Sequence, residues 1–261
     1  MNHNGHYVYL LVYVDDILVT GSSSSLVQRI IEDIARKFFI KDMGALGYFL
    51  GLKAIRTPNG LHLMQRKYIT DLLNKVDMLH AKPVSTPLPS SPKLTLNSST
   101  TLSDPHEYRM IVGSLQYLAL TRPDISYAIN KLSQYMHRPT TDHWQAVKRV
   151  LRYLSGTLTH GIFLQKQKNP MLHAFSDADW AGDSDDYVST NAYIIYLGSQ
   201  PISWTSKKQK GVARSSTEAE YRSVANTAAE VRWVVSLLRE LGLPIRQTPT
   251  IYCDNIGATY L

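Results

Sequence analysis

The sequence has 261 residues, of which 44% are hydrophobic and 19% charged, so wholesale disorder is excluded and one or two domains can bury a core. Its 28 Lys and Arg residues exceed its 21 Asp and Glu residues, and the net charge of +7 favours polyanions, nucleic acid above all, as partners. The single cysteine, Cys253, excludes an internal disulfide and indicates a reducing, intracellular compartment rather than secretion. We expect no membrane span, because the apolar run over residues 7–14 is far shorter than the roughly 20 residues that a bilayer requires.

The first part of the chain predicts two hairpins and two helices. Residues 7–21 (YVYLLVYVDDILVTG) form two apolar runs around Asp15 and Asp16, which predicts a buried hairpin with both carboxylates at its tip. A second hairpin is expected over residues 46–65, where Asn59-Gly60 favours a tight turn. One amphipathic helix is expected between the hairpins and a second over residues 66–79. The apolar positions of the first helix are Leu26, Ile30, Ile31, Ile34 and Phe38.

The composition changes at residue 82. Residues 82–105 are rich in Pro, Ser and Thr and lack apolar periodicity, which predicts a loose linker. Three helices are expected after the linker, with Pro123 and Pro139 as breaks between them. Their expected ranges are 108–120, 125–136 and 142–154.

The last third of the sequence predicts three strands, a long helix and a final strand. The helix is expected over residues 218–241, because Ser215 to Glu218 reads as a capping box and Gly242 follows its end. The expected strands are 172–177, 191–197, 202–204 and 250–253. The expected inward stripe of the helix consists of Val224, Ala228, Val231, Val235 and Leu238. The pattern therefore predicts two α/β units joined by a loose tether.

Adjacent carboxylates at the tip of a hairpin suit a divalent cation. Asp15 and Asp16 repel each other unless a cation compensates their charge. Mg²⁺ is such a cation, because it prefers a few carboxylate oxygens together with substrate phosphates. An arbitrary Asp-Asp pair usually marks only a polar turn, but the apolar runs on both sides and Tyr13 favour metal binding here.

Several short motifs occur along the chain in a fixed order. Residues 13–16 read YVDD, and LGYFLGLKA, LTRPDISYAIN, DADWAGD, SSTEAEY and YCDN follow. The first is similar to the YVDD box of reverse transcriptases, and with the others in the family's order the whole chain resembles the Pol polyprotein of copia-type retrotransposons. The resemblance implies an α/β (α+β) fold made of a partial reverse-transcriptase palm and thumb, a helical connection, and a partial RNase H-like domain with a mixed sheet. The implied boundaries are 1–81 for palm and thumb, 82–105 for the linker, 106–165 for the connection and 166–261 for the RNase H-like domain. Similar open reading frames occur in plant genomes, mitochondrial ones included, so the cytoplasm, nucleus or mitochondrion is the expected compartment.

The resemblance implies two Mg²⁺-dependent centres that transfer phosphoryl groups on nucleic acid by a two-metal mechanism. Asp15 and Asp16 match the metal-binding pair of the polymerase. Asp177, Glu220 and Asp254 match the acidic residues of RNase H, which converge at one edge of the sheet in that fold. We prefer Glu220 to Glu218 because apolar packing residues follow it, whereas Glu218 fits the capping box by reaching back to the Ser215 amide.

Six basic residues are expected to contact phosphates, each with ordinary solvation as its alternative. They are Lys53, Arg56, Arg66, Lys67, Lys207 and Lys208. The implied partners are an RNA/DNA template-primer, an RNA–DNA hybrid and the remainder of a Pol polyprotein.

Compared with the family, the chain is expected to be incomplete at both centres. The family's further polymerase Asp precedes the YVDD hairpin, and the distal strand and fourth acidic position of RNase H follow the YCDN motif. Residues 184–191 (SDDYVSTN) also depart from the family pattern. We therefore expect a poor polymerase, and the alternatives are an inactive remnant that at most binds nucleic acid and a stand-alone RNase H-fold nuclease.

Overall fold

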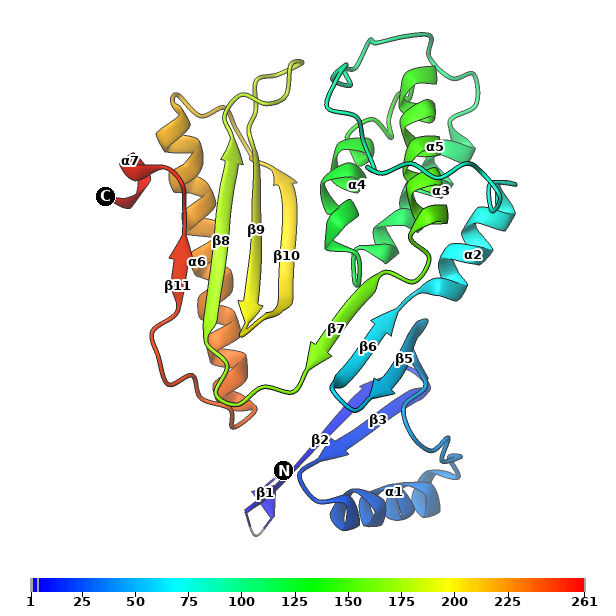
Figure 1. Ribbon diagram of the computed structural model, residues 1–261, viewed down its shortest axis with the longest axis vertical. Coiled ribbons are helices and arrows are strands. Elements are labelled where there is room, and N and C mark those ends of the chain that lie inside the picture. Colours follow the sequence, from blue (N-terminus) through cyan, green and yellow to red (C-terminus); the bar gives the residue numbers. More distant parts are fainter. Residues whose placement is uncertain (1, 4, 261) are drawn as a thin grey trace. The chain divides into compact units, whose positions relative to one another are not determined.

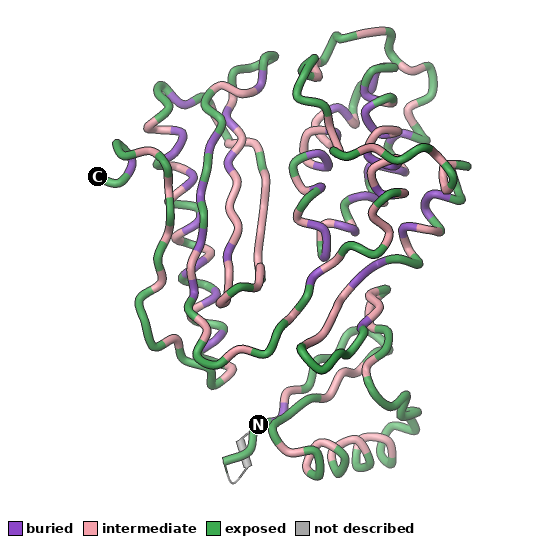
Figure 2. The backbone as a smooth tube through the Cα atoms, viewed as in Figure 1, coloured by how far each residue is buried: buried purple, intermediate pink, exposed green. Residues whose placement is uncertain are grey.

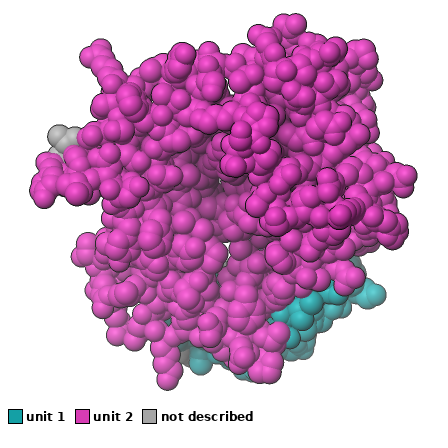
Figure 3. Space-filling model, turned by 45° about the horizontal axis from the view of Figure 1, so that its top comes forward, with its two compact units in different colours: residues 1–56 teal, residues 57–261 magenta. Residues whose placement is uncertain are grey.

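The computed structural model describes residues 2–3 and 5–260, and the chain forms two compact units, residues 1–56 and 57–261 (Figure 3). Each unit combines helices with strands, so the mixed α/β class predicted from the sequence is confirmed (Figure 1). None of the helices in the described residues has the length and apolar character that crossing a bilayer requires.

Unit 1 contains a hairpin followed by a helix, as the sequence predicts. Strands β2 (His6–Tyr13) and β3 (Asp16–Gly21) are antiparallel, and Tyr13 pairs with Asp16 across the turn. Helix α1 (Ser24–Phe38) is capped by Ser23, whose Oγ accepts a hydrogen bond from the Leu26 amide. The remaining strands of the unit are β1 (Asn2–His3), β4 (Tyr48–Phe49) and β5 (Leu52–Thr57), the last of which reaches the boundary between the units.

The expected burial of the first hairpin is wrong. Val8 is the only buried residue of β2 and β3, and α1 has no buried residue (Figure 2). Leu10, Leu11 and Val12 are each more than half exposed. The reason is that α1, which packs on β3, is too small to cover the apolar hairpin by itself.

Unit 2 begins with the strand pair β6 (Gly60–Met64) and β7 (Gly161–Gln165). The two strands are antiparallel, with Met64 opposite Gly161. Between them the chain forms a helical bundle that contains the largest buried cluster. The helices are α2 (Arg66–Lys75), α3 (His106–Leu118), the 3-10 turn η1 (Pro123–Ile125), α4 (Ser126–Ser133) and α5 (Thr141–Gly156).

A buried cation holds the end of the bundle together. Arg122 is 1% exposed, and its guanidinium binds the Asp124 carboxylate at 2.7 Å and the Thr157 carbonyl oxygen at 3.1 Å. The Tyr153 hydroxyl donates to the same carboxylate. These contacts tie the turn after α3 to the C-terminal end of α5.

Residues 82–105, which we call the strap, contain no helix or strand, but they are not the loose linker that their composition predicts. The carbonyl oxygen of Leu94 accepts a hydrogen bond from the Tyr135 hydroxyl at 2.7 Å, and that of Thr95 lies 3.0 Å from His143 Nε2. The Leu102 amide donates to the Pro139 carbonyl oxygen at 2.9 Å. The backbone of the strap thus takes its partners from the helical bundle, which composition alone does not reveal.

The second sheet of unit 2 has the strand order β10-β9-β8-β11. Strand β8 pairs antiparallel with β9 and parallel with β11, and helix α6 packs on β8 and β9. Every second residue of β8, from Leu172 to Ala178, is buried on the α6 side. The bounds are β8 Leu172–Asp179, β9 Thr190–Leu197, β10 Gln200–Lys208, α6 Ser216–Glu240, β11 Thr250–Tyr252 and α7 Ile256–Thr259.

The buried face of α6 differs from the expected apolar stripe. Val231 and Leu238 are buried as predicted, but the N-terminal half of the helix presents Ser223 and Thr227 to the sheet instead of Val224 and Ala228. The hydroxyl groups of both residues form hydrogen bonds with β8. Their burial therefore leaves no hydroxyl without a hydrogen-bond partner.

Candidate active site

The Asp15–Asp16 pair lies at an exposed turn of unit 1. Val14 and Asp15 connect β2 to β3, and Val14 has a left-handed φ of 49°, which is strained for a β-branched residue. The tight turn presents both carboxylates to solvent. In the described part of the chain, no third His, Cys, Asp or Glu ligand lies close enough to join them in a metal-binding group.

Three further carboxylates come from neighbouring elements of the second sheet. Asp177 lies on β8, Asp254 follows β11, and Glu220 lies near the start of α6. Because β8 and β11 are parallel neighbours, Asp177 and Asp254 lie at the same end of the sheet. The pairing of the strands thus brings Asp177, Glu220 and Asp254 into one region of the fold.

Glu220 is the buried member of this group. It is 5% exposed, and its Oε1 accepts a hydrogen bond from the Ala178 amide at 3.0 Å. Burial raises the pKa of Glu220, the hydrogen bond from Ala178 opposes this, and the charges of Asp177 and Asp254 raise the pKa further. A buried carboxylate that faces two like charges suits a cation, which would relieve the repulsion.

Cys253 is a neighbour that the sequence analysis did not assign to the site. One ligand atom each from Glu220, Cys253 and Asp254 lie within 4.8 Å of one another. The thiol points to Glu220 Oε2 at 3.6 Å, and burial raises its pKa, as do the nearby carboxylates. Asp177 is outside this closest group, although its charge acts on Glu220. Cys253 could have been included from the sequence, because it directly precedes Asp254.

Glu218, the alternative to Glu220, is occupied elsewhere. Ser215 caps α6 through a hydrogen bond from the Glu218 amide at 3.1 Å, as expected. The Glu218 carboxylate, however, accepts from the Arg214 amide at 2.7 Å and pairs with Arg222 at 2.6 Å, rather than reaching the Ser215 amide. Glu218 is therefore half-exposed and paired with Arg222 at the start of the helix. Glu220, rather than Glu218, faces the other carboxylates.

A chain of hydroxyl groups fixes β8 against α6 beneath the carboxylates. Ser223 Oγ donates to the backbone carbonyl oxygen of Asp177 at 2.8 Å and accepts from Ser176 Oγ at 3.0 Å. Thr227 Oγ1 donates to Ser176 Oγ at 3.0 Å. Sequence reasoning missed this network because Ser and Thr in a helix carry no period that distinguishes buried from exposed positions.

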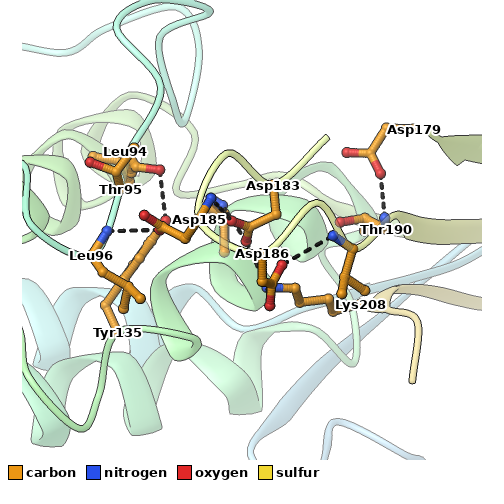
Figure 4. Close-up of polar contacts among 12 residues, drawn as sticks. Leu94, Thr95, Leu96, Tyr135, Asp179, Asp183, Asp185, Asp186, Thr190 and Lys208 are labelled. Atoms are coloured by element: carbon orange, nitrogen blue, oxygen red, sulfur yellow. Dashed lines mark hydrogen bonds and ion pairs between the residues drawn. The ribbon is translucent and has the colours of Figure 1, made fainter. Parts of the chain in front are cut away.

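The loop between β8 and β9 is held by a buried ion-pair cluster (Figure 4). The Asp183 carboxylate is 5% exposed and binds the ammonium groups of Lys131 at 3.0 Å and Lys208 at 2.8 Å. Burial raises the pKa of Asp183, but hydrogen bonds from Lys208, the Asp185 amide and Lys131 outweigh it and bring the pKa to about 2. Asp185 in turn accepts from the Leu96 amide of the strap at 2.8 Å. The loop that follows Asp177 is thus tied to α4, β10 and the strap.

Asp179 lies in the same region, at the end of β8. Its carboxylate accepts a hydrogen bond from the Thr190 amide across the loop. Burial raises the pKa of Asp179; the hydrogen bond opposes this, and the charge of Asp177 adds to it. Asp179 and Asp183 therefore order the loop.

The six basic residues expected to contact phosphates are distributed over several elements of the two units. Arg56 on β5 belongs to unit 1, as does Lys53, whereas Arg66 and Lys67 begin α2 in unit 2. Lys207 and Lys208 end β10, and they differ: Lys207 is exposed, whereas Lys208 also pairs with Asp186 at 2.7 Å. The charge of the Lys208 ammonium group is therefore largely neutralised by carboxylates of the protein itself.

Comparison with known proteins identifies the lineage. Residues 2–90 match the family model for reverse transcriptase (RNA-dependent DNA polymerase). The chain is 65% identical over 254 residues, 97% of its length, to the retrovirus-related Pol polyprotein from transposon RE2 of Arabidopsis thaliana, of which it covers 17%. It is 39% identical over 262 residues to the Pol polyprotein from transposon TNT 1-94 of Nicotiana tabacum, covering 97% of this chain and 20% of the relative. An uncharacterized mitochondrial protein of Arabidopsis thaliana is 49% identical over 229 residues, 87% of this chain and 94% of that protein.

The chain belongs to the copia-type retrotransposon Pol family and comprises a reverse-transcriptase-family region of that polyprotein. It spans about a fifth or less of the length of the Pol polyproteins that it matches.

Proposed function

We propose that residues 166–261 form an RNase H-like domain that hydrolyses the RNA strand of an RNA–DNA hybrid. The proposal rests on one observation: Glu220 and Asp254 offer ligand atoms within 4.8 Å of each other, and the charge of Asp177 acts on Glu220 at the same end of the sheet. The sheet β10-β9-β8-β11 has antiparallel and parallel pairs and a helix packed on β8 and β9, which supports the RNase H-like domain with a mixed sheet that the resemblance implies.

The donor set at this end of the sheet fits a hard divalent cation such as Mg²⁺. Glu220 and Asp254 supply carboxylate oxygens within 4.8 Å of each other, and Asp177 adds negative charge beside them. Divalent ions bound there would activate a water molecule and stabilise the leaving oxygen of a phosphodiester. The protein's own contribution is to fix Glu220 through the Ala178 amide and Asp177 through Ser223.

Cleavage of a 5′-labelled RNA strand in an RNA–DNA hybrid tests this assignment. We expect Asp177→Asn and Glu220→Gln to reduce the rate at least about a hundredfold, because each removes charge that a metal-dependent transition state requires. Glu218→Gln is the matched control, since it removes a neighbouring carboxylate that binds Arg222, and it should change the rate only a few-fold. Equal rates for the wild type and Asp177→Asn would refute the assignment.

We further infer that Asp15 and Asp16 belong to the metal site of the polymerase and that the partners of unit 1 are a template-primer and the rest of Pol. Both carboxylates are exposed, and no third ligand accompanies them among the described residues. We therefore expect this polypeptide alone to extend a primer on an RNA template poorly in Mg²⁺. Processive synthesis by the isolated chain would contradict that expectation.

An inactive remnant that only binds nucleic acid is the rival interpretation, and the solvent-exposed apolar hairpin of unit 1 favours it. Hybrid binding without any cleavage by the wild type, in Mg²⁺ and in Mn²⁺, would support the remnant and contradict the nuclease.

A further inference from the structure

Cys253, Glu220 and Asp254 offer a sulfur atom and carboxylate oxygens at a single point of the fold. Their ligand atoms, one from each residue, lie within 4.8 Å of one another. The Mg²⁺ ions proposed for this end of the sheet would use the two carboxylates and leave the thiol without a role. Because Mg²⁺ takes oxygen ligands, whereas thiolate sulfur selects ions such as Zn²⁺, the thiol changes which metals this group can hold.

The separation of the sulfur from the buried carboxylate fits a tetrahedral ion. Sγ of Cys253 lies 3.6 Å from Oε2 of Glu220. Two atoms bound to one tetrahedral Zn²⁺, at about 2.3 Å for sulfur and about 2.1 Å for oxygen, lie about 3.6 Å apart. An ion that replaces the thiol proton between these two atoms therefore needs no change in their separation, and Asp254 supplies the third ligand of the group.

Glu220 is a buried carboxylate without a basic partner in the described part of the chain. It is 5% exposed, and none of the ion pairs between described residues includes it. Its Oε1 accepts a hydrogen bond from the Ala178 amide, and its Oε2 faces the thiol. Buried charges in proteins are normally paired or bind a metal. The missing positive charge indicates a cation at this point, independently of the ligand distances.

The segment that carries Cys253 and Asp254 is held at both ends. Before it, β11 pairs in parallel with β8. After it, Asn255 caps α7 through a hydrogen bond from the Ala258 amide at 3.1 Å, and α7 packs on α6, the helix of Glu220. Asp254 is exposed, so the group is open to solvent on that side and an ion can enter there.

We propose that Cys253, Glu220 and Asp254 form a site for a thiophilic divalent ion of the Zn²⁺ class, with water at the remaining position. On binding, the S–H bond of Cys253 breaks, its proton goes to solvent, and the sulfur forms a bond to the ion. The bound ion takes Glu220 and Asp254 from Mg²⁺, so the site gives the nuclease an inhibitory metal. This inhibition rests on the proposed function, whereas the metal site itself does not.

Titration of the full chain with Co²⁺, in the absence of nucleic acid, tests the site. A Co²⁺–thiolate bond produces an absorption band in the near ultraviolet, and Cys253 is the single cysteine of the sequence, so the band reports this thiol alone. Zn²⁺ should displace Co²⁺ and remove the band. Mg²⁺ at the same concentration should not, because thiolate ligands select Zn²⁺.

Two variants and a matched control show whether the ligands act together. Cys253→Ser should abolish the band, and Glu220→Gln should keep it but weaken Co²⁺ binding at least about tenfold, as the loss of a metal-site partner does. Glu218→Gln is the control, since it removes a nearby carboxylate that is paired with Arg222, and it should bind Co²⁺ like the wild type. Unaltered circular dichroism of the variants excludes misfolding as the cause of a loss.

Three results would overturn the proposal: no band in the wild type, a band that Mg²⁺ removes as readily as Zn²⁺, or wild-type affinity in Glu220→Gln. Hybrid cleavage in Mg²⁺ then tests the inhibition, which we expect at the Zn²⁺ concentrations that remove the Co²⁺ band. Cleavage that saturating Zn²⁺ leaves unchanged would overturn the inhibitory role. A chain that shows the band but does not cleave contradicts the nuclease alone, and one that cleaves without a band contradicts the metal site alone.

Discussion

Replacing Asp183 with Asn tests whether the buried ion-pair cluster stabilises unit 2. Asp183 contacts Lys131 and Lys208 and is 5% exposed, so solvent screens these pairs weakly. Its pKa lies at about 2 in the folded protein, against an ordinary value of 3.8. At 1.36 kcal/mol for each unit of pKa, the folded environment favours the ionised form by about 2.5 kcal/mol. The upper bound for Asp183→Asn is about 3–5 kcal/mol, the cost of leaving buried charges without their partner.

The sign of the pH dependence follows from the lowered pKa. Because folding lowers the pKa of Asp183, its stabilisation is fully present above the unfolded value of 3.8. It is lost as the pH falls from 3.8 towards 2, and about half of it should remain at pH 3. The difference in unfolding free energy between the wild type and Asp183→Asn should shrink accordingly.

Urea unfolding followed by tryptophan fluorescence measures this difference in the right part of the chain. All four tryptophans, Trp144, Trp180, Trp204 and Trp233, belong to unit 2. The control is Asp186→Asn, because Asp186 contacts the same Lys208 but is 52% exposed, and exposed pairs contribute about 0–1 kcal/mol. Equal destabilisation by the two variants at pH 7, or a loss for Asp183→Asn that is unchanged at pH 3, would refute the reasoning.

Three further outcomes are expected. Because the pKa of Glu220 is raised in the folded protein, its ionised form lowers the free energy of unfolding at neutral pH. Glu220→Gln should therefore raise the urea midpoint in EDTA, and raise it less in Mg²⁺, where a bound cation would offset the repulsion in the wild type. A lower midpoint in EDTA would contradict this. Gly161→Ala should cost at least about 2 kcal/mol, because a Cβ there overlaps the Leu63 carbonyl oxygen, whereas Gly113→Ala in α3 has open space and should gain about 0.5–1 kcal/mol in the same unfolding assay. Limited trypsin digestion should cut α1, which has no buried residue, before any site in the helical bundle, and mass spectrometry of the early fragments would reveal the opposite order.

Local patterns in the sequence predict the elements of both units well. The 3.6-residue period and the Ser215 cap place α6 within two residues of its observed start, and the apolar alternation of β8 and β9 places both strands. These features depend on neighbouring residues, which is why the sequence alone suffices for them.

Features that depend on distant partners were not predictable. The backbone of the strap is hydrogen-bonded to Tyr135, His143, Pro139 and Asp185, and no local pattern in residues 82–105 encodes these partners. Cys253 joins Glu220 only through the parallel pairing of β11 with β8. The grouping of Asp177, Glu220 and Asp254 came from the family resemblance, since three acids so far apart carry no signal by themselves.

The pairing of β6 with β7 has a consequence for protein engineering. The segment between Met64 and Gly161 begins and ends at two paired strand ends, so the helical bundle is an insertion within a β-hairpin. Such a module should tolerate transplantation into a hairpin turn of an unrelated host. The transfer would remove its contacts with the second sheet. They include the ion pair of Lys131 with Asp183, the hydrogen bond from the Leu96 amide to Asp185, and the hydrogen bond from the Trp204 indole to the Ala119 carbonyl oxygen at 2.9 Å.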